Sequence, residues 1–577
     1  MLERKTKKII FFTILIFISF LLFFTVISYW VISERNLPTT KTKRQDIAQR
    51  GNIVSSDGYI VSSSKRLYKS VIDKRNLDPD KKDLFIKLYS IYSGESRKSI
   101  RKKIDLAKKN QVTLSYSIDF KKSRHLKDLA RKLYKLGVFR FYYNEKTNTT
   151  FLHGLSIIQS GEKRVYSYAD TLTPVVGYVR KYESTKNLTK VKGIKGLEHS
   201  FNDFLEASKD GEIKGSKDVV RTIILDKTIT KEKRVDGNDL VINLNLKIQK
   251  DIEKILDFYN KKFESDEIII SVINSKNSNV LALASSNRFH PNNINKKDYP
   301  SLNINAVEYL YEPGSVIKPF VFALFLRYGV TKLEDIIYLH GGKYKIGKKV
   351  ITDSHPLEWV GTDNVLTRSS NIGMAKLVQK LSALELFHGL KIFGFTKYSG
   401  LELTYEKTGS IPSLLRLSSQ IYKATISYGY GMKTNFMQIL KAYNIFNNDG
   451  ISTNPTLLKS TKKQNVQVIS KDLANTMKRL LIKTVEEGTG RRAKVKGLEI
   501  GGKTGTAHIA SKGTYQDLYH SSFFGFVNDS NSSYTIGVLV KKIPKNDYYF
   551  ASKSATVVFK SIIELLVEKK LLIKIAQ

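Results

Sequence analysis

Ser315 and Lys318 stand three residues apart, directly after the turn-forming pair Pro313-Gly314. The apolar run from Val316 to Leu326 predicts a buried helix, so both side chains would share one helical face near its N-terminus. A serine hydroxyl becomes a good nucleophile when a neighbouring base takes its proton, and burial can make lysine that base because it disfavours the charged form. The helix start would stabilise the alkoxide and the oxyanion that follows. The pair therefore predicts nucleophilic serine chemistry.

The same Ser-x-x-Lys spacing recurs elsewhere, at Ser62/Lys65, Ser99/Lys102 and Ser460/Lys463. Lysine is abundant in this chain, and we expect these three copies to be solvated surface. Ser315 differs in its context, because a turn precedes it, an apolar helix follows it, and two polar clusters downstream can serve as partners. The three copies are therefore useful comparisons for the Ser315 site.

The first partner cluster is Ser369-Ser370-Asn371, which lies on a turn between Val365-Leu366 and a helical run from Met374 to Leu381. Ser369 and Asn371 can point the same way. The hydroxyl could relay a proton between the base and a leaving amine, while the amide could hold a substrate carbonyl and the lysine. The structural alternative is a helix cap, a common role for Ser and Asn.

The second partner cluster surrounds Lys503 on a predicted strand, within Gly501-Gly502-Lys503-Thr504-Gly505-Thr506-Ala507. Glycines beside a strand lysine let a substrate or another backbone approach closely. The Lys503 ammonium could bind a substrate carboxylate and, by like-charge repulsion, help to keep Lys318 neutral. Thr504 and Thr506 would add hydroxyls and a backbone N–H. The second Lys-Thr-Gly, which begins at Lys407, falls in a turn, and we expect a loop there.

An uncharged run of 24 residues, Ile9 to Ile32, follows four basic residues near the N-terminus. It is long enough to cross a bilayer, and no small-residue cleavage site follows it. We expect an uncleaved signal anchor whose basic flank stays cytoplasmic, with the chain from Ser33 onward exported. The absence of cysteine suits that compartment and excludes disulfides and cysteine metal sites.

The formal net charge of +43 raises the question of nucleic-acid binding. The basic residues are spread along most of the chain, however, and no nucleic-acid-binding motif is present. We therefore predict no nucleic-acid partner and expect general basicity, which would attract anionic lipid or wall polymer. The nine histidines show no metal-ligand spacing, so no metal site is predicted.

The pattern of the chain changes near residue 236. Upstream it is polar and mixed, typical of a spacer or docking platform. Downstream, apolar strands are predicted at both ends and helices between them, which favours an α+β domain with a mostly antiparallel sheet. The predicted organisation is a cytoplasmic tail at 1–8, a membrane span at 9–32, a pedestal at 33–235 and the domain containing Ser315 at 236–577.

The three motifs Ser315-x-x-Lys318, Ser369-x-Asn371 and Lys503-Thr504-Gly505 resemble, in this order, those of penicillin-binding proteins and serine β-lactamases. Flanking residues make the chain similar to class B penicillin-binding proteins of the cell-division (FtsI) type. After residue 240 these flanks are Tyr311-Glu312-Pro313-Gly314, Ser427-Tyr428-Gly429-Tyr430-Gly431, Gln438 with Ala442-Tyr443, Asn448-Asp449-Gly450 and Glu487-Gly488-Thr489-Gly490. In the N-terminal half they are Arg50-Gly51-Asn52-Ile53, Arg164-Val165-Tyr166 and Gly193 to Glu198.

The resemblance implies a membrane-anchored D,D-transpeptidase that cross-links peptidoglycan. Ser315 would attack the penultimate D-Ala carbonyl, Lys318 would take its proton, and the amides of Ser315 and Thr506 would form the oxyanion hole. Ser369 would pass a proton to the leaving D-Ala, Asn371 would orient the substrate, and Lys503 with Thr504 would hold its carboxylate. β-Lactams would acylate the serine, and no metal or organic cofactor is needed. The implied partners are peptidoglycan stem peptides, the membrane, a membrane glycosyltransferase and other divisome proteins.

Several alternatives remain open from the sequence. An elongation-type transpeptidase would use the same chemistry, and a non-catalytic β-lactam sensor or divisome scaffold would not use the serine. A secreted β-lactamase would lack the anchor and pedestal, and a bifunctional synthase would need a glycosyltransferase domain. His508 could be a base but is expected to be a variable strand residue. Asp353 and His355 could form a dyad, but a loop hydrogen bond is the expected role.

Overall fold

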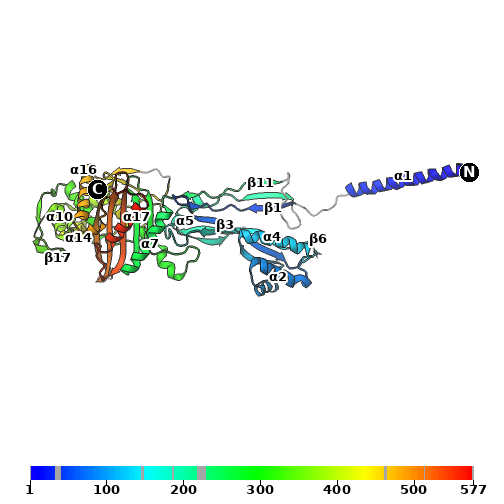
Figure 1. Cartoon of the computed structure of the whole chain (residues 1–577), viewed down its shortest axis with the longest axis horizontal. Helices are drawn as coiled ribbons and strands as arrows, with labels where there is room; N and C mark the ends of the chain where they lie inside the picture. The colour runs from blue at the N-terminus through cyan, green and yellow to red at the C-terminus, as the bar shows by residue number, and fades with distance from the viewer. Residues whose placement is uncertain are drawn as a thin grey trace. The chain divides into compact units, whose positions relative to one another are not determined.

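The computed structural model describes residues 2–32, 41–144, 149–184, 188–216, 229–459, 464–511 and 514–574. The Ser460/Lys463 pair falls outside them. The chain forms two compact units that do not follow chain order (Figure 1). Unit 1 comprises residues 1–47, 69–158 and 210–234, and unit 2 comprises residues 48–68, 159–209 and 235–577. The chain therefore passes between the two units several times before residue 236.

Unit 1 contains the N-terminal helix α1 (Leu2–Ile32), whose described side chains are exposed and mostly apolar. It is the one helix in the described residues that is long and apolar enough to cross a membrane, over Arg4–Ile32, and it fits a single-pass anchor. The remaining elements of unit 1 are β1 (Lys41–Asp46), α2 (Lys82–Ser93), α3 (Arg97–Asp105), β4 (Gln111–Ile118), α4 (Phe120–Lys135), β5 (Tyr142–Asn144), β6 (Thr149–Phe151), β10 (Gly211–Ser216) and β11 (Thr230–Glu232).

The N-terminal part of unit 2 is built around a buried ionic cluster. Glu198 accepts hydrogen bonds from Arg50 Nε at 2.9 Å, Arg164 Nε at 2.7 Å and Ser62 Oγ at 2.8 Å. Burial alone would raise the pKa of Glu198, but the two guanidinium groups lower it below its usual value. The expectation that Ser62 is solvated surface is therefore wrong, because this serine is fully buried and helps to satisfy the carboxylate.

Replacing Glu198 with glutamine is expected to destabilise unit 2 by about 3–5 kcal/mol, because two buried arginines lose their counter-charge. Urea unfolding followed by far-UV circular dichroism measures this change. The control is Glu334→Gln, an exposed glutamate whose replacement should change stability by no more than about 0.5 kcal/mol. If Glu198→Gln lowered the free energy of unfolding by no more than the control does, the ionic cluster would contribute little to stability.

The strands and short helices around this cluster form a sheet in the order β12-β2-β3-β7-β9-β8. Strands β3 and β7 each contribute residues to both units. The elements are β2 (Ile53–Val54), β3 (Ile60–Asp73), β7 (Ser156–Tyr166), β8 (Tyr178–Glu183), β9 (Thr189–Lys195), α5 (Gly196–Ser200), α6 (Asn202–Leu205) and β12 (Leu240–Val241).

The rest of unit 2 is organised on a five-stranded antiparallel sheet in the order β14-β13-β23-β22-β21. Its strands are β13 (Glu267–Asn274), β14 (Val280–Ser285), β21 (Glu499–Ser511), β22 (Thr514–Asn528) and β23 (Ser533–Pro544). Successive side chains of β13 point to opposite faces of the sheet, and each face packs against a separate hydrophobic core. Ile268 and Ile270 pack with α7 (Leu246–Phe263) and α17 (Ala555–Glu568), while Ile269 packs with the helices inserted between β14 and β21.

Figure 1 shows α7 and α17 beside the strands of this sheet. The predicted α+β fold with an antiparallel sheet and a helical subdomain is confirmed. The inserted elements are α8 (Asn305–Glu308), α9 (Lys318–Arg327), β15 (Ile336–Tyr338), β16 (Lys343–Ile346), β17 (Lys349–Thr352), β18 (Trp359–Gly361), α10 (Thr362–Thr367), α11 (Asn371–Leu377), α12 (Ala383–Ile392), α13 (Leu414–Leu417), α14 (Gln420–Ser427), α15 (Phe436–Asn447), β19 (Ile451–Thr453), β20 (Asn465–Gln467) and α16 (Lys471–Glu486).

Helix α9 forms the centre of the helical part, and every residue from Lys318 to Phe325 is buried. The ring centroid of Phe320, for example, lies within 5.2 Å of the ring centroids of Phe393, Phe395, Tyr443 and Phe446. Full burial of one such side chain contributes about 1.5–3 kcal/mol. This packing holds the N-terminal end of α9, which carries Lys318, in a fixed position.

Candidate active site

Ser315 opens onto a cavity of about 190 Å³ in unit 2. Five of the predicted site residues line it, namely Ser315, Ser369, Asn371, Thr504 and Thr506. The other residues that line it are Leu339, Asp353, Ser354, His355, Leu357, Arg368, Ser370, Tyr430, Thr489, Phe550, Ala551 and Ser552. Segments far apart in the sequence therefore meet here.

Ser315 lies in a short 3-10 turn, Gly314–Ile317, that leads into α9. Gly314 has the left-handed φ of 61°, a conformation that glycine adopts without strain. The turn packs against β21 at Gly505, where an added Cβ would lie 2.8 Å from Val316 Cγ1 and 3.2 Å from the carbonyl oxygen of Pro313. Glycine at position 505 therefore permits the close approach that places the serine beside the Lys503 strand.

Lys318 is fully buried behind the serine. Its Nζ lies 2.6 Å from the carbonyl oxygen of Ser369, 3.1 Å from Ser369 Oγ and 2.8 Å from Asn371 Oδ1. Burial lowers the pKa of Lys318 to about 7, although Asp353 acts in the opposite direction. A substantial fraction of the amine is therefore neutral at physiological pH, as a general base requires.

The Ser369-Ser370-Asn371 turn is held by Asp353, which follows β17 and precedes β18 and α10 in sequence. Asp353 accepts hydrogen bonds from Ser370 Oγ at 2.5 Å and from the backbone N–H of Asn371 at 2.6 Å. Ser370 caps α11 by accepting from the Gly373 N–H at 2.9 Å. Ser369 has a φ of 63°, which for a non-glycine residue costs on the order of 1 kcal/mol. The cap keeps that strained serine turned toward Lys318.

Lys503 is also fully buried, and its Nζ lies 3.2 Å from the carbonyl oxygen of Thr504 and 3.3 Å from Thr504 Oγ1. Thr504 Oγ1 is in turn 2.7 Å from Thr489 Oγ1. Thr506 Oγ1 accepts from the Ala551 N–H at 3.0 Å and so ties β21 to the segment before α17. The hydroxyls of Thr504 and Thr489 give the Lys503 side of the cavity a polar lining suited to a carboxylate.

The two buried amines influence each other's charge. Burial and, after it, the charge of Lys318 lower the pKa of Lys503 well below its ordinary value. Because repulsion between two ammonium groups is mutual, it disfavours the state in which both amines are charged; burial is the largest cause of the lowered pKa of Lys318. An anion that entered the cavity would raise the pKa of Lys503 again, because an opposite charge favours the ammonium.

Sequence reasoning did not identify Thr489, Tyr430 or Phe550 as residues of this cavity. Thr489 and Tyr430 belong to two of the flanking motifs of the sequence analysis, Glu487-Gly488-Thr489-Gly490 and Ser427 to Gly431. These motifs could have indicated that both residues lie at the site. Phe550 had no signal of its own. The expected loop hydrogen bond of Asp353 is present, and its partner is the Ser370-Asn371 segment.

None of the described residues of the comparison motifs lines the cavity. Lys407 is in a loop, as expected, and its backbone pairs with Val307 and Asn435. Ser99 and Lys102 are in α3 of unit 1, where Lys102 is exposed. His508 stacks on Tyr519, with 4.5 Å between ring centroids, and is not one of the residues that line the Ser315 cavity.

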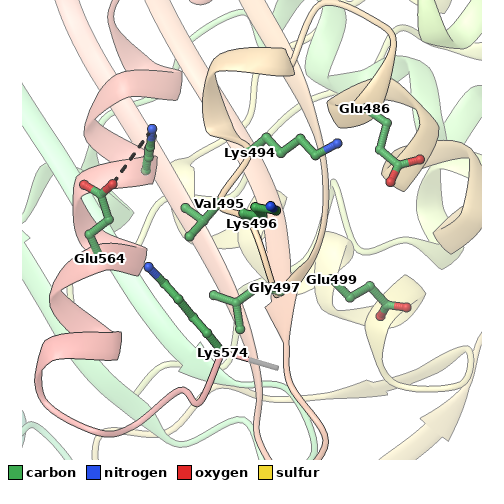
Figure 2. A pocket seen from close by; sticks show the side chains of 10 residues that line it. Glu486, Lys494, Val495, Lys496, Gly497, Glu499, Glu564 and Lys574 are labelled. Carbon is green, nitrogen blue, oxygen red and sulfur yellow. Dashed lines mark ion pairs between the residues drawn. The ribbon is translucent and has the colours of Figure 1, made fainter. Parts of the chain in front are cut away.

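A larger cavity of about 850 Å³ lies between the end of α16, the start of β21 and α17 (Figure 2). Its charged residues are lysines and glutamates, and two of its three glutamates form ion pairs. Lys560 pairs with Glu564 at 3.9 Å, and Glu499 pairs with Lys478 at 2.6 Å. None of its lining residues carries a hydroxyl, imidazole or thiol, so it does not repeat the serine site of the smaller cavity.

Two family models match the chain. "Penicillin binding protein transpeptidase domain" matches residues 268–564, and "Penicillin-binding Protein dimerisation domain" matches residues 45–242. Together they cover the motif residues and most of the chain that precedes them. The first match includes more than half of the chain.

Similar proteins include the "Peptidoglycan D,D-transpeptidase FtsI" of Buchnera aphidicola subsp. Baizongia pistaciae, 25% identical over 98% of this chain and 94% of its own length. The "Probable peptidoglycan D,D-transpeptidase PenA" of Neisseria meningitidis is 29% identical, over 62% of each chain. Penicillin Binding Protein 2X from Streptococcus thermophilus shares the fold, with a TM-score of 0.74 and 20% identity over 90% of this chain and 80% of its own. The chain therefore belongs to the penicillin-binding protein transpeptidase family, as a class B member of the FtsI type.

Proposed function

We propose that this protein is a serine-type peptidoglycan D,D-transpeptidase that joins stem peptides through an acyl-enzyme on Ser315. The observation that carries the proposal is the convergence of Ser369 and Asn371 on the buried Lys318, at 2.6–3.1 Å, behind the cavity that Ser315 lines. Membership of the family and the names of the relatives supply the substrate class.

In the first half-reaction, Ser315 Oγ attacks the carbonyl carbon of the penultimate D-Ala and its proton passes to neutral Lys318. The carbonyl oxygen becomes an oxyanion, which the backbone N–H groups of Ser315 and Thr506 stabilise. The C–N bond to the terminal D-Ala then breaks. The proton held by Lys318 reaches the leaving amine through Ser369, whose hydroxyl lies 3.1 Å from the lysine nitrogen.

In the second half-reaction, the amine of another stem peptide attacks the ester carbon of the acyl-enzyme. That amine loses a proton to Lys318, the C–O bond to Ser315 breaks, and the serine recovers its hydrogen. Before the terminal D-Ala leaves in the first half-reaction, Lys503 with Thr504 holds its carboxylate, and Asn371 orients the donor backbone through its amide. β-Lactams present a strained amide and a carboxylate to the same groups and leave a stable ester on Ser315.

The cellular setting is part of the proposal. Residues 1–8 form a cytoplasmic tail, residues 9–32 cross the inner membrane, residues 33–235 form a pedestal and residues 236–577 catalyse the reaction on the extracytoplasmic side. The apolar α1, with basic residues at its start, supports this orientation. The FtsI name of the relatives favours septal synthesis with a membrane glycosyltransferase and divisome proteins as partners. A fluorescent fusion that follows the side wall instead of the septum would favour an elongation role.

Labelling of the detergent-solubilised full chain with a fluorescent penicillin tests the proposal. Wild type is expected to give a covalent band after electrophoresis, and Ser315→Ala is expected to give none, because the ester cannot form. Ser99→Ala, in a matched Ser-x-x-Lys of unit 1, should label like wild type. An unlabelled but folded wild type, with a normal thermal transition and an unchanged intact mass after prolonged exposure, would refute the proposal.

The acylation rate of wild type is expected to rise with pH through the neutral range. The pKa of Lys318 is lowered to about 7, so the amine is charged below that pH and neutral above it. Because only the neutral amine can accept the Ser315 proton, the rate should rise about tenfold between pH 6 and pH 8. Labelling time courses at fixed ionic strength measure the profile. A rate that is constant over this range would exclude Lys318 as the titrating base.

A further inference from the structure

Four aromatic rings form a continuous row on the helical part of unit 2. Successive ring centroids lie 4.6 Å apart from Trp359 to Tyr338, 4.5 Å from Tyr338 to His340 and 5.0 Å from His340 to Tyr344. We call Tyr338, His340, Tyr344 and Trp359 the aromatic row. No residue of this row was singled out by the sequence motifs.

Two residues of the row lie on the outer face of the two-stranded sheet β15–β18, whereas Tyr344 belongs to β16 and packs in part against a buried cluster. Tyr338 of β15 is paired with Trp359 of β18, so their side chains share one face. The neighbouring residues Ile337 and Val360 point the other way and pack against the core. Trp359 is 62% exposed and Ile336, on its face, is 70% exposed. An exposed tryptophan beside an exposed isoleucine indicates an interaction surface, because solvated proteins rarely gather such side chains.

The same segment is strongly basic. Residues 336–352 contain Lys343, Lys345, Lys348 and Lys349 and no acidic residue, whereas the exposed Glu334, Asp335 and Glu358 flank the two strands that carry Tyr338 and Trp359. All four lysines are exposed, and within the described chain they form no ion pair. Lys376 adds a fifth cation beneath the row, with Nζ 5.9 Å from the Tyr338 ring centroid and 5.6 Å from that of Tyr344. The surface is therefore complementary to an anionic ligand with faces that can stack on aromatic rings.

Residues next to the row in sequence line the Ser315 cavity. Leu339, which stands between Tyr338 and His340, lines the cavity, as does Leu357, two residues before Trp359. Asp353, which follows β17, also lines it and holds the Asn371 segment. A long substrate whose reacting end occupies the cavity could therefore extend along this surface.

We propose that the aromatic row and its lysines bind the glycan strand of the peptidoglycan substrate, and so form a saccharide subsite beside the catalytic cavity. The C–H faces of sugar rings stack on the aromatic rings, and the carboxylates of the stem peptides lie against the lysines. This inference rests on the proposed function and adds to it where the polymer part of the substrate is held. An acidic protein is the alternative ligand, and it would need the lysines without any sugar.

The chain has only two tryptophans, Trp30 in α1 and Trp359 in the row, which makes a direct test possible. In full-length protein carrying Trp30→Phe and Ser315→Ala, emission reports on Trp359 alone and no acyl-enzyme forms. Titration with soluble, uncross-linked glycan strands that keep their stem peptides should change the emission saturably. Neutral N-acetylglucosamine oligomers should give the same change at higher concentration, and polyglutamate should give none.

Matched variants locate the site. Tyr344→Ala and the double change Lys345→Glu/Lys349→Glu should each weaken glycan-strand binding at least about fivefold, and the second effect should shrink in high salt. Tyr398→Ala, at a 63% exposed tyrosine away from the row, and Lys496→Glu, in the larger cavity of Figure 2, should leave the affinity unchanged. Thermal unfolding of each variant confirms that it is folded.

The outcomes separate the two proposals. Emission that glycan strands leave unchanged, while wild type still labels with penicillin, overturns the saccharide subsite and leaves the proposed function standing. Polyglutamate that competes as well as the strands would assign the surface to an acidic polypeptide and would also overturn it. If folded wild type is not labelled by penicillin, the proposed function itself is contradicted, whatever the fluorescence shows.

Discussion

Replacing Lys318 with methionine is expected to lower the rate at which penicillin acylates Ser315 by about 10² to 10⁴-fold, the usual contribution of a positioned base. Methionine fills most of the volume of the buried lysine, so the loss should reflect the missing amine rather than a cavity. The amide of Asn371 and the carbonyl of Ser369 lose a hydrogen-bond donor, which adds a moderate loss of stability. Time-resolved labelling with a fluorescent penicillin measures the rate.

The matched control is Lys441→Met. Lys441 is another largely buried lysine of unit 2, and burial lowers its pKa to about 8. Its Nζ donates to the carbonyl oxygen of Ser399, away from the cavity. This variant should lose stability but keep the wild-type acylation rate. If both lysine variants slowed acylation to the same extent, a general weakening of the fold would explain the result and Lys318 would not be the base.

The pH profile gives a second, independent signature for Lys318. In wild type the acylation rate should rise through about pH 7, where the pKa of this lysine lies. In Lys318→Met the residual rate should lose that rise, because no amine remains to titrate beside Ser315. A retained rise with the same midpoint would assign the titration to another group.

The sequence allowed the principal site residues to be predicted because each motif is fixed by local structure. Ser315 follows a turn that Gly314 makes possible, and the apolar run after it could be buried only as a helix. The contacts between Lys318 and the Ser369-Asn371 turn join residues 51 and 53 positions apart. Chemistry suggested this pairing, since an amine, a hydroxyl and an amide complement one another, but local pattern alone could not supply its geometry.

Other features depend on tertiary packing that leaves no local pattern. Thr489 contacts Thr504 only because the start of β21 returns past the end of α16. Ser62 looked like a surface residue, yet its hydroxyl satisfies a carboxylate that lies 136 positions away. How far the pKa values of Lys318 and Lys503 fall depends on how deeply each amine is buried, and the sequence does not contain that depth. For the same reason, the division of the chain into two interleaved units was not visible before the contacts were known.

Replacing Lys503 with methionine is expected to slow acylation by penicillin by about 10² to 10³-fold, as for truncation of one partner of a buried, hydrogen-bonded charge pair. In the empty cavity, burial and the charge of Lys318 keep the pKa of Lys503 low. The carboxylate of the ligand restores the ammonium and binds it, together with Thr504. Without Lys503 that carboxylate loses the ammonium and keeps only the hydroxyls of Thr504 and Thr489 on this side of the cavity. The second-order rate constant of labelling measures the loss.

The strongest control for this prediction uses both the second Lys-Thr-Gly and a change in the ligand. Lys407→Met alters the matching tripeptide in an exposed loop and should leave the rate unchanged. A penicillin methyl ester, which lacks the charged carboxylate, should acylate wild type almost as slowly as penicillin acylates Lys503→Met. The ester should acylate Lys503→Met only slightly more slowly than it acylates wild type, because the two changes remove one shared interaction. If the two losses were additive, Lys503 would not bind the carboxylate, and its effect would have to come from the charge of Lys318 or from packing.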